Sequence, residues 1–501
     1  TNCPRYPSPP TTHAAARMTT TSDAPVSRRL GRHLEATDMG ARGGYVPPHA
    51  RARRATKTSA SASASASASG TGVGGARALD GLEKEMVAAA KKCKKRGVDV
   101  AEGFAAYERA LEGLRALVRA EGADGARVAL SEGLLEYAGE VVRRARLERL
   151  GETSREDERR ALERASALAK EALETFERVE GEPVVRSNGM ATALSQAAEY
   201  GAHGDDARGK ATALRRAVEA YDAAATTIEG SGNVGEGLLP ALWNCADARL
   251  KAAEAAAELD DVGAAATLYD EAFNLYERAC GYCDASQGDD LGSFLYDWGC
   301  SLTSYAQFLL QTNERAAAAT AAERAVEKLR NAARFSTGAV EPLNALGDVY
   351  QTQAEIALRE DETDAEHHAE TALRRAREDA YETALRADAA DLDATVGVGE
   401  TMMSYAAILR RRGDAESARA AYADAWRAYE RALSLDDALR PAACEERFAI
   451  VYNAACAANR TGDVIRAREL IHGLLLCGFT SRDVVDADDD LRADAAFVSR
   501  D

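Results

Sequence analysis

The chain has 501 residues, of which 46% are hydrophobic and 29% charged, and its formal net charge is −18. This composition is ordinary for a globular protein, and the negative charge disfavours bulk nucleic-acid binding while leaving a local basic groove open. No apolar run approaches the roughly 20 residues that a bilayer span needs. The nine scattered cysteines favour reduced thiols in an intracellular compartment over a secreted disulfide framework.

The N-terminal segment, residues 1–79, is predicted to be disordered. It holds eleven basic and three acidic residues, a net of +8, which leaves −26 for the rest of the chain. It also contains the low-complexity run SASASASASASG at 59–70, which cannot bury enough apolar surface to offset its ordering entropy. Because 39–79 has basic but no acidic residues, we expect an organellar transit peptide, plastid or mitochondrial; the alternative is a disordered cytoplasmic tail.

The remainder is predicted to be all-α, because it is rich in Ala, Glu and Arg and lacks alternating β-branched segments. The hexapeptide AYERAL occurs at 106–111 and again at 428–433. It belongs to a recurring pattern in which a large residue is followed, three residues later, by a small apolar one. From Tyr221 onward these large residues are spaced 55, 53, 52 and 48 residues apart. A period of about fifty in helical sequence predicts stacked helical hairpins.

Each large residue is expected to fill a hole beside a small residue that lets the neighbouring helix approach. The partner helices carry an apolar–x–x–apolar–Gly pattern, as in LYDWGCSL (295–302) and PLNALGDVY (342–350). The residues predicted to pack in this way are Tyr107, Phe176, Tyr221, Tyr276, Trp298, Gly299, Leu329, Gly347, Tyr381 and Tyr429.

These helices resemble the tetratricopeptide repeat (TPR). The first helix of that repeat has the apolar–Gly pattern, and its second helix carries A-x-x-x-[FY]-x-x-A, found here at 265–272 and 418–425. Gly-Asp turns within 411–425 and 459–471 also match. The resemblance covers 80–477 but departs in its period, which is about fifty instead of about 34, as in a long-helix variant of plant and algal TPR proteins.

The resemblance implies a right-handed α-solenoid of about eight antiparallel helical hairpins. Its second helices are expected near 98–120, 154–180, 206–229, 261–283, 314–335, 363–388, 414–434 and 463–477. Residues 478–501 are expected to form a C-terminal capping tail, in which Leu491 and Phe497 close the apolar end of the array. A similar acidic ending follows such repeats in many proteins of photosynthetic organisms.

The function implied by the resemblance is a non-enzymatic scaffold, or an assembly or chaperone-type adaptor, that binds a segment of another protein on a concave face built from the first helices. An RNA-binding helical-repeat protein is the alternative, and GGYVPPHAR (43–51) is similar to a short segment in the tails of DEAD-box RNA helicases. The lysines with which some TPR proteins bind chaperone tails are absent. Candidate partner-binding residues on the concave face are Asn244, Asp247, Asn344, Asp348, Tyr350 and Asn453.

No catalytic, cofactor or metal site is expected. GSGNVGEG (230–237) follows an alanine-rich helix, whereas a dinucleotide site needs a preceding strand, so it is interpreted as a loop. Cys280 and Cys283 form a single C-x-x-C, interpreted as two small residues ending a helix, with a thiol or zinc role as the alternative. DADDD (486–490) lacks the glycine and glutamate of a calcium loop, and His367–His368 lies in a polar turn.

Overall fold

The computed structural model describes residues 73–94, 100–148, 155–201, 207–231, 238–282, 288–336, 338–359, 364–439, 445–476 and 480–492. Within these ranges all regular structure is helical, as the composition predicts. Residues 73–439 belong to one compact unit and 445–492 to a second. None of the described helices combines the length and the hydropathy that a bilayer span requires.

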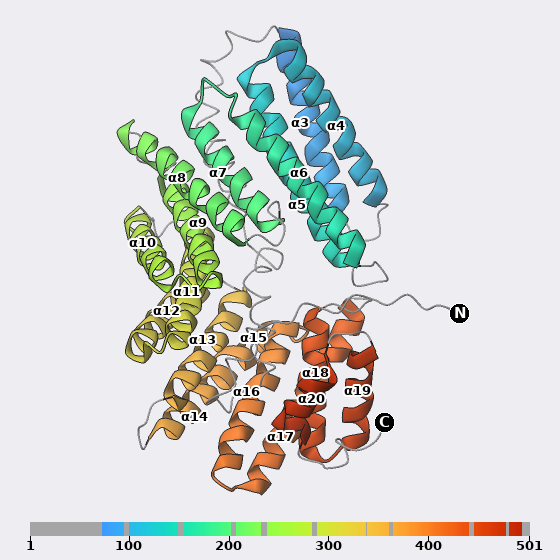
Figure 1. Cartoon of the computed structure of the whole chain (residues 1–501), viewed down its shortest axis with the longest axis vertical. Helices are drawn as coiled ribbons and strands as arrows, with labels where there is room; N and C mark the ends of the chain where they lie inside the picture. Colours follow the sequence, from blue (N-terminus) through green and yellow to red (C-terminus); the bar gives the residue numbers. More distant parts are fainter. Residues whose placement is uncertain are drawn as a thin grey trace, which may run out of the picture. The chain divides into compact units, whose positions relative to one another are not determined.

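Consecutive helices pack against each other as hairpins (Figure 1). In the described part of the first unit these are α3 (Val73–Lys94) with α4 (Val100–Glu121), α5 (Asp124–Glu148) with α6 (Arg155–Phe176), α7 (Pro183–Glu199) with α8 (Ala207–Gly230), α9 (Leu238–Glu258) with α10 (Val262–Cys280), α11 (Gly288–Gln311) with α12 (Arg315–Phe335), α13 (Glu341–Leu358) with the run α14 (Ala365–Arg375), η3 (Ala376–Tyr381) and α15 (Glu382–Ala387), and α16 (Leu392–Arg411) with α17 (Ala415–Leu439).

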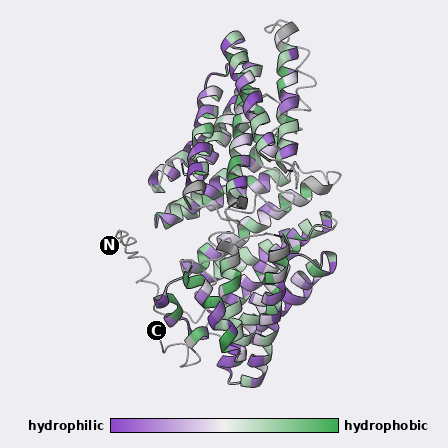
Figure 2. Cartoon of the chain, turned by 90° about the vertical axis from the view of Figure 1, so that its right-hand side faces the viewer, coloured by the Kyte–Doolittle hydropathy of each residue, from purple (hydrophilic) through white to green (hydrophobic). Residues whose placement is uncertain are grey.

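The second unit contains α18 (Glu445–Thr461) paired with α19 (Val464–Leu476), followed by the short helices α20 (Arg482–Ala487) and α21 (Asp489–Arg492). The all-α array of helical hairpins predicted from the fifty-residue period is therefore confirmed. Each hairpin's second helix lies within a few residues of the expected range. Most second helices are amphipathic. Figure 2 shows hydrophobic and hydrophilic residues interleaved along the helices.

The predicted boundary at residue 79 is wrong by seven residues, because α3 already begins at Val73. Its glycine-rich start has the composition of a loop, but Leu79 and Leu82 pack against the core cluster that contains Met86 and Leu114. Burying apolar surface stabilises a folded chain by about 25 cal/mol per Å². The contacts of Leu79 and Leu82 therefore favour the helix over the coil. Residues 1–72, which carry the expected disordered segment and transit peptide, lie outside the described residues.

The hairpins pack through large second-helix residues that lie against glycines of the first helices. A Cβ on Gly299 would lie 2.5 Å from Cγ of Leu329, and one on Gly399 would lie 2.8 Å from Cε1 of Tyr429. A side chain at either glycine would therefore have to displace the neighbouring residue, so glycine is what permits this approach. The ten residues predicted to pack between helices are all buried.

The turn from a first helix to its second helix has a recurring geometry. Gly413 has a positive φ of 79°, and the following Asp414 accepts a hydrogen bond from the main-chain N–H of Ser417 at 3.1 Å, which caps α17. Gly462 has the same left-handed conformation before α19, with φ 96°. Before α10 the position is taken by Asp260, with φ 59°, because aspartate tolerates this region better than most residues.

The interface between α10 and α11 is an aromatic layer. The rings of Tyr276 and Trp298 stack with centroids 5.7 Å apart, and those of Tyr269 and Tyr305 are 4.8 Å apart. These rings bury large apolar areas and add favourable ring–ring geometry. They belong to one continuous core cluster that runs from α7 to α16, so the hairpins from α7 to α16 share a single core.

In the second unit, the C-terminal tail folds back on α18. The Tyr452 hydroxyl donates to Oδ2 of Asp488 at 2.9 Å, and Nε of Arg460 lies 2.8 Å from Oδ1 of Asp490. Leu491 is only 1% exposed. Two of the aspartates of DADDD are thus occupied by contacts with the protein itself. Phe497 lies outside the described residues, so the capping role of the tail stays a prediction.

Candidate interaction surface

Tyrosine hydroxyls on second helices reach one equivalent position on the first helices. The Tyr276 hydroxyl donates to Oδ1 of Asp247 at 2.9 Å, and the Tyr381 hydroxyl donates to Oδ1 of Asp348 at 2.5 Å. In the hairpin α7–α8 the hydroxyls of Tyr221 and Thr192 are 2.9 Å apart. Each tyrosine is buried, whereas Asp247 is half-buried and Asp348 is exposed. The position is thus accessible on α9 and α13, whereas on α7 it holds Thr192, which is buried.

Three of the six residues predicted to bind a partner do not lie on an accessible surface. The exposed fractions of Asn244, Tyr350 and Asn453 are 2%, 1% and 8%. The Tyr350 hydroxyl accepts a hydrogen bond of 2.7 Å from Arg330 of α12, so this side chain is directed toward the preceding hairpin. The prediction was wrong because a first helix is covered on most of its circumference by its own second helix and by neighbouring hairpins.

The other three predicted residues remain accessible. Asp348 is exposed, and Asp247 and Asn344 are half-buried. Asn344 Nδ2 donates to Oδ1 of Asp391 at 3.0 Å, and the same carboxylate oxygen caps α16 by accepting from the N–H of Ala394 at 2.6 Å. Asn344 therefore joins α13 to the first helix of the next hairpin. Whether these residues bind a partner stays a prediction.

A further carboxylate, Asp297 of α11, belongs to the same side and was missed. Asp247, Asp297 and Asp348, which we call the acidic row, are 50 and 51 residues apart, which is the repeat period. This spacing is the signal that would have found Asp297. Burial, and then Asp247 and Asp297, raise the pKa of Tyr276. The pKa of the Cys300 thiol is raised first by burial, then by the charge of Asp297 and more weakly by that of Asp348. Asp297 therefore acts on Tyr276 together with Asp247, and on Cys300 together with Asp348.

Among the described residues, six buried amide oxygens have no hydrogen-bond partner within the chain. Three of them are Oδ1 of Asn188 on α7, of Asn244 on α9 and of Asn344 on α13; the others are Oε1 of Gln196 and Oδ1 of Asn453 and Asn459. Asn244 precedes Asp247 by three residues and Asn344 precedes Asp348 by four, spacings that put each pair on one helix face. Buried acceptors without donors are uncommon in folded proteins, so these three form an unusual series.

A cleft of about 250 Å³ lies between α14 and α16, with Leu373, Met402 and Tyr405 among the residues that line it. Arg377, on its rim, donates to Glu382 at 2.7 Å and to Sδ of Met402 at 3.5 Å. Arg377 on the rim is therefore already engaged by contacts within the chain.

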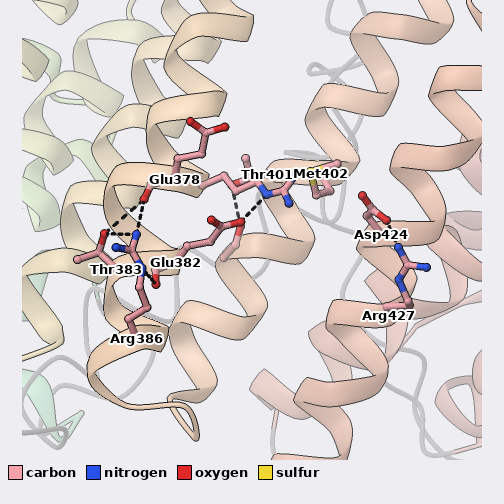
Figure 3. A network of polar contacts seen from close by, with 10 residues as sticks. Glu378, Glu382, Thr383, Arg386, Thr401, Met402, Asp424 and Arg427 are labelled. Atoms are coloured by element: carbon pink, nitrogen blue, oxygen red, sulfur yellow. Dashed lines mark hydrogen bonds and ion pairs between the residues drawn. The ribbon is translucent and has the colours of Figure 1, made fainter.

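The π-helix η3 adjoins this cleft and is fixed by polar contacts. Figure 3 shows the Arg386 guanidinium between the Thr383 hydroxyl, at 3.1 Å, and the Glu378 carbonyl, at 3.2 Å. Tyr381 follows Asp348 by 33 residues, whereas Tyr276 follows Asp247 by 29. A π-helix takes one extra residue into a helix. η3 can therefore account for only one of the four additional residues between Asp348 and Tyr381.

Some of the sequence motifs could have formed a thiol, metal or nucleotide site. Cys280 is exposed at the end of α10, but Cys283 lies outside the described residues, as do residues 232–237 of the glycine-rich stretch. The segment before Gly230 is the helix α8, as predicted, and not a strand. Across the described part of the chain, no group of three or more His, Cys, Asp or Glu side chains could hold a metal ion.

No protein-family model matches this chain, and no curated protein sequence does. Among solved structures, a circular tandem repeat protein with a novel repeat topology is 15% identical, with a TM-score of 0.33 over 82% of this chain and 98% of its own. The nuclear import adaptor Nro1 of S. pombe is 12% identical, with a TM-score of 0.41 over 62% and 94%. Human IFIT1, solved as a dimer with m7Gppp-AAAA, is 14% identical, with a TM-score of 0.26 over 80% and 95%.

Proposed function

We propose that this chain is a non-enzymatic, TPR-like scaffold that binds a segment of another protein along the outward face of its first helices. The observation that carries the proposal is the acidic row, in which Asp247, Asp297 and Asp348 recur at the repeat period on α9, α11 and α13. A segment laid along these helices would meet one such side chain in each hairpin. This is the way in which repeat proteins use extended surfaces for recognition.

Charge favours a protein over RNA as the bound partner. Residues 80–501 carry a net charge of −26, and the acidic row adds carboxylates to the face in question. A phosphate backbone is bound chiefly through Lys and Arg, so this face would repel it. Both Asp247 and Asp348 hold a tyrosine hydroxyl, which keeps their carboxylates in place without neutralising them.

Two matched tryptophan variants test the proposed face. Ser301 of α11 follows Asp297 by four residues, is half-buried and donates to the Asp297 carbonyl at 2.7 Å. Thr320 of the second helix α12 is exposed and donates in the same way to the Ala316 carbonyl at 3.0 Å. Ser301→Trp would therefore cover the first-helix face, whereas Thr320→Trp adds the same bulk to a second helix.

The experiment is affinity purification of the tagged full-length chain from its own cells, with and without RNase, followed by mass spectrometry. We expect one or a few stoichiometric proteins that survive RNase, are lost with Ser301→Trp and are kept with Thr320→Trp. Loss of all retained material with RNase would favour the RNA-binding alternative. Equal retention by the two tryptophan variants would place the interaction elsewhere.

A further inference from the structure

The second helix of the second unit carries the two most exposed large hydrophobic side chains among the described residues. Ile465 and Leu476 of α19 are each 75% exposed, whereas Val87, Val262 and Tyr282 are 43–44% exposed. Ile465 and Leu476 are 11 residues apart (476 − 465), which is about three helical turns, so both lie on one face of α19. Single exposed apolar residues are common, but two that share a helix face indicate a contact surface.

Glu469 and His472 lie between these two hydrophobic residues on the same face of α19. Counted from Ile465, the four positions are i, i+4, i+7 and i+11, which follow the period of a helix, and all four side chains are exposed. We call these four residues the α19 stripe. The opposite face, which includes Ile471 and Leu474, is buried, and α19 packs against α18. The stripe is therefore directed away from the core of its own hairpin.

The α19 stripe is complementary to a reversed copy of itself. The midpoint between Ile465 and Leu476 is position 470.5, and Glu469 and His472 have the same midpoint. An antiparallel second copy centred on this point would therefore place Ile465 against the partner's Leu476. It would also place Glu469 against the partner's His472, and each contact would occur twice. This self-complementarity is what a two-fold, isologous interface requires.

The polar pair of the stripe is complementary in chemistry as well as in position. Glu469 is 59% exposed, and its Oε2 pairs with Arg466 of the same helix at 2.9 Å. A carboxylate can accept further hydrogen bonds, and the imidazole of His472 has at least one N–H to donate. A parallel arrangement would instead bring two Glu469 carboxylates together, which like charges disfavour. The antiparallel arrangement is therefore the one that the charges favour.

Gly473, which adjoins His472, is a second feature that indicates a helix from outside the chain. A Cβ at this position would have nothing within 4 Å, so no contact within the described part of the chain requires a glycine there. Glycine weakens a helix relative to alanine, but it lets another backbone approach closely. A glycine inside α19 is therefore explained better by the approach of a second helix than by the packing of its own hairpin.

We infer that α19 is the interface of a homodimer, in which the α19 stripes of two copies pack antiparallel about a two-fold axis. This inference does not depend on the proposed function and goes beyond it, because a dimer would carry two copies of any surface that binds a partner. A bilayer fits the stripe less well, since Glu469 would have to enter the apolar boundary. One helix of 13 residues per copy makes a small interface, so we expect a dimer that dissociates on dilution.

The test is sedimentation velocity of the purified full-length chain at concentrations from about 1 to 200 µM, the range in which small interfaces associate. The first variant combines Ile465→Ser and Leu476→Ser. Its matched control combines Val87→Ser and Val262→Ser, which lie outside the stripe. All four side chains are exposed, so neither variant removes packing from a core.

Three further variants test the antiparallel register, and they are Glu469→Lys, His472→Glu and the two changes combined. In the antiparallel dimer, Glu469→Lys would put a cation against each His472. His472→Glu would put a carboxylate against each Glu469. The combined variant restores one acidic and one basic group to every polar contact of the stripe.

We expect a monomer–dimer equilibrium whose dissociation constant rises about tenfold or more when both stripe hydrophobics are replaced by serine, and stays unchanged in the control. Each single charge change should raise the dissociation constant about fivefold, and the combined variant should return it to within about twofold of the natural value.

Monomers at every concentration would overturn the inference, as would a dimer that forms equally well without Ile465 and Leu476. Failure of the combined variant to restore the dimer would overturn the antiparallel pairing. If a monomeric natural chain floated with vesicles of phosphatidylcholine and phosphatidylserine, and the double serine variant did not, the stripe would be a membrane contact instead.

Discussion

The ring of Tyr381 fills the space that a side chain on Gly347 would need. A Cβ on Gly347 would lie 2.3 Å from Cζ of this ring, and a Cβ on Gly397 would lie 2.4 Å from the same atom. Gly347 belongs to α13 and Gly397 to α16, so one second-helix ring is held between the first helices of two successive hairpins. The Tyr381 ring therefore helps to pack α13 against its own second helix and against the first helix α16 of the following hairpin.

Gly347→Ala is expected to destabilise the first unit. Alanine raises helix propensity by about 1 kcal/mol over glycine, but overpacking against a buried ring costs about 1–3 kcal/mol, so we expect a net loss of up to about 2 kcal/mol. Urea unfolding followed by circular dichroism measures it. Gly81 of α3 has nothing within 4 Å of its Cβ position, so Gly81→Ala should stabilise; equal effects of the two changes would contradict the packing described here.

Tyr276→Phe is expected to cost about 1 kcal/mol of stability, because the Asp247 carboxylate loses the hydroxyl that donates to it at 2.9 Å. The ring itself stays, so the stacking on Trp298 should survive, and near-ultraviolet circular dichroism should change little. Tyr282 is 43% exposed at the end of α10, and Tyr282→Phe is the control, for which no loss is expected. A loss of equal size there would mean that the buried hydroxyl has no special role.

Asp124 is expected to make the first unit lose stability as the pH falls. It accepts hydrogen bonds from the main-chain N–H of Gly181 at 2.6 Å and of Glu180 at 3.1 Å, and it pairs with Arg127 at 2.8 Å. Burial raises the pKa of this carboxyl, but the bonds from Gly181, Arg127 and Glu180 outweigh it and hold the pKa below its usual value.

Because the pKa of Asp124 is lower in the folded chain than in the unfolded one, its contribution is complete above the unfolded value of about 4 and is lost as the pH falls through the folded value. Asp124→Asn should therefore lower stability at pH 7 and flatten the decline of stability in acid. Unfolding midpoints measured between pH 3 and pH 7 check this. If the stability of Asp124→Asn declined with falling pH as steeply as that of the natural chain, other carboxylates would be responsible for the acid dependence.

Arg460→Ala is expected to release the C-terminal tail from α18. The side chains of Arg460 and Asp490 are 14% and 10% exposed, and removing one partner of a buried ion pair costs about 3 kcal/mol or more. Limited proteolysis within the tail should become faster. Arg466 pairs with Glu469 on the surface of α19, so Arg466→Ala should leave the cleavage rate unchanged; similar rates for both variants would contradict a tail held by the Arg460–Asp490 pair.

The packing of the hairpins could be predicted from the sequence because it depends on local pairs of residue size that recur at a fixed period. Leu329 beside Gly299 and Tyr381 beside Gly347 join residues that the pattern names. The turn at Asp260 could not be recognised as one of the Gly-Asp type, since its left-handed residue is not glycine. The start of α3 was missed because residues 73–79 were included in the N-terminal segment predicted to be disordered.

The candidate surface was harder to predict, because it depends on how each first helix is rotated about its axis. Repeat position alone placed Tyr350 and Asp348 on the same face, whereas the structure buries the first and exposes the second. In the structure, Asp348 lies on the side of α13 where its carboxylate accepts the Tyr381 hydroxyl. Asp297 could have been found from the sequence, because its spacing from Asp247 and Asp348 equals the repeat period.

The central claim is that the outward face of the first helices binds a protein, and site-specific photocrosslinking in living cells tests it most directly. Ser304 of α11 lies seven residues after Asp297, on the same helix face, and is half-buried, whereas Glu323 of α12 is exposed on a second helix. With a photoreactive phenylalanine derivative at each position in turn, our account predicts a protein adduct from position 304 and none from position 323. Adducts from position 323 alone, or an RNA adduct from position 304, would contradict it.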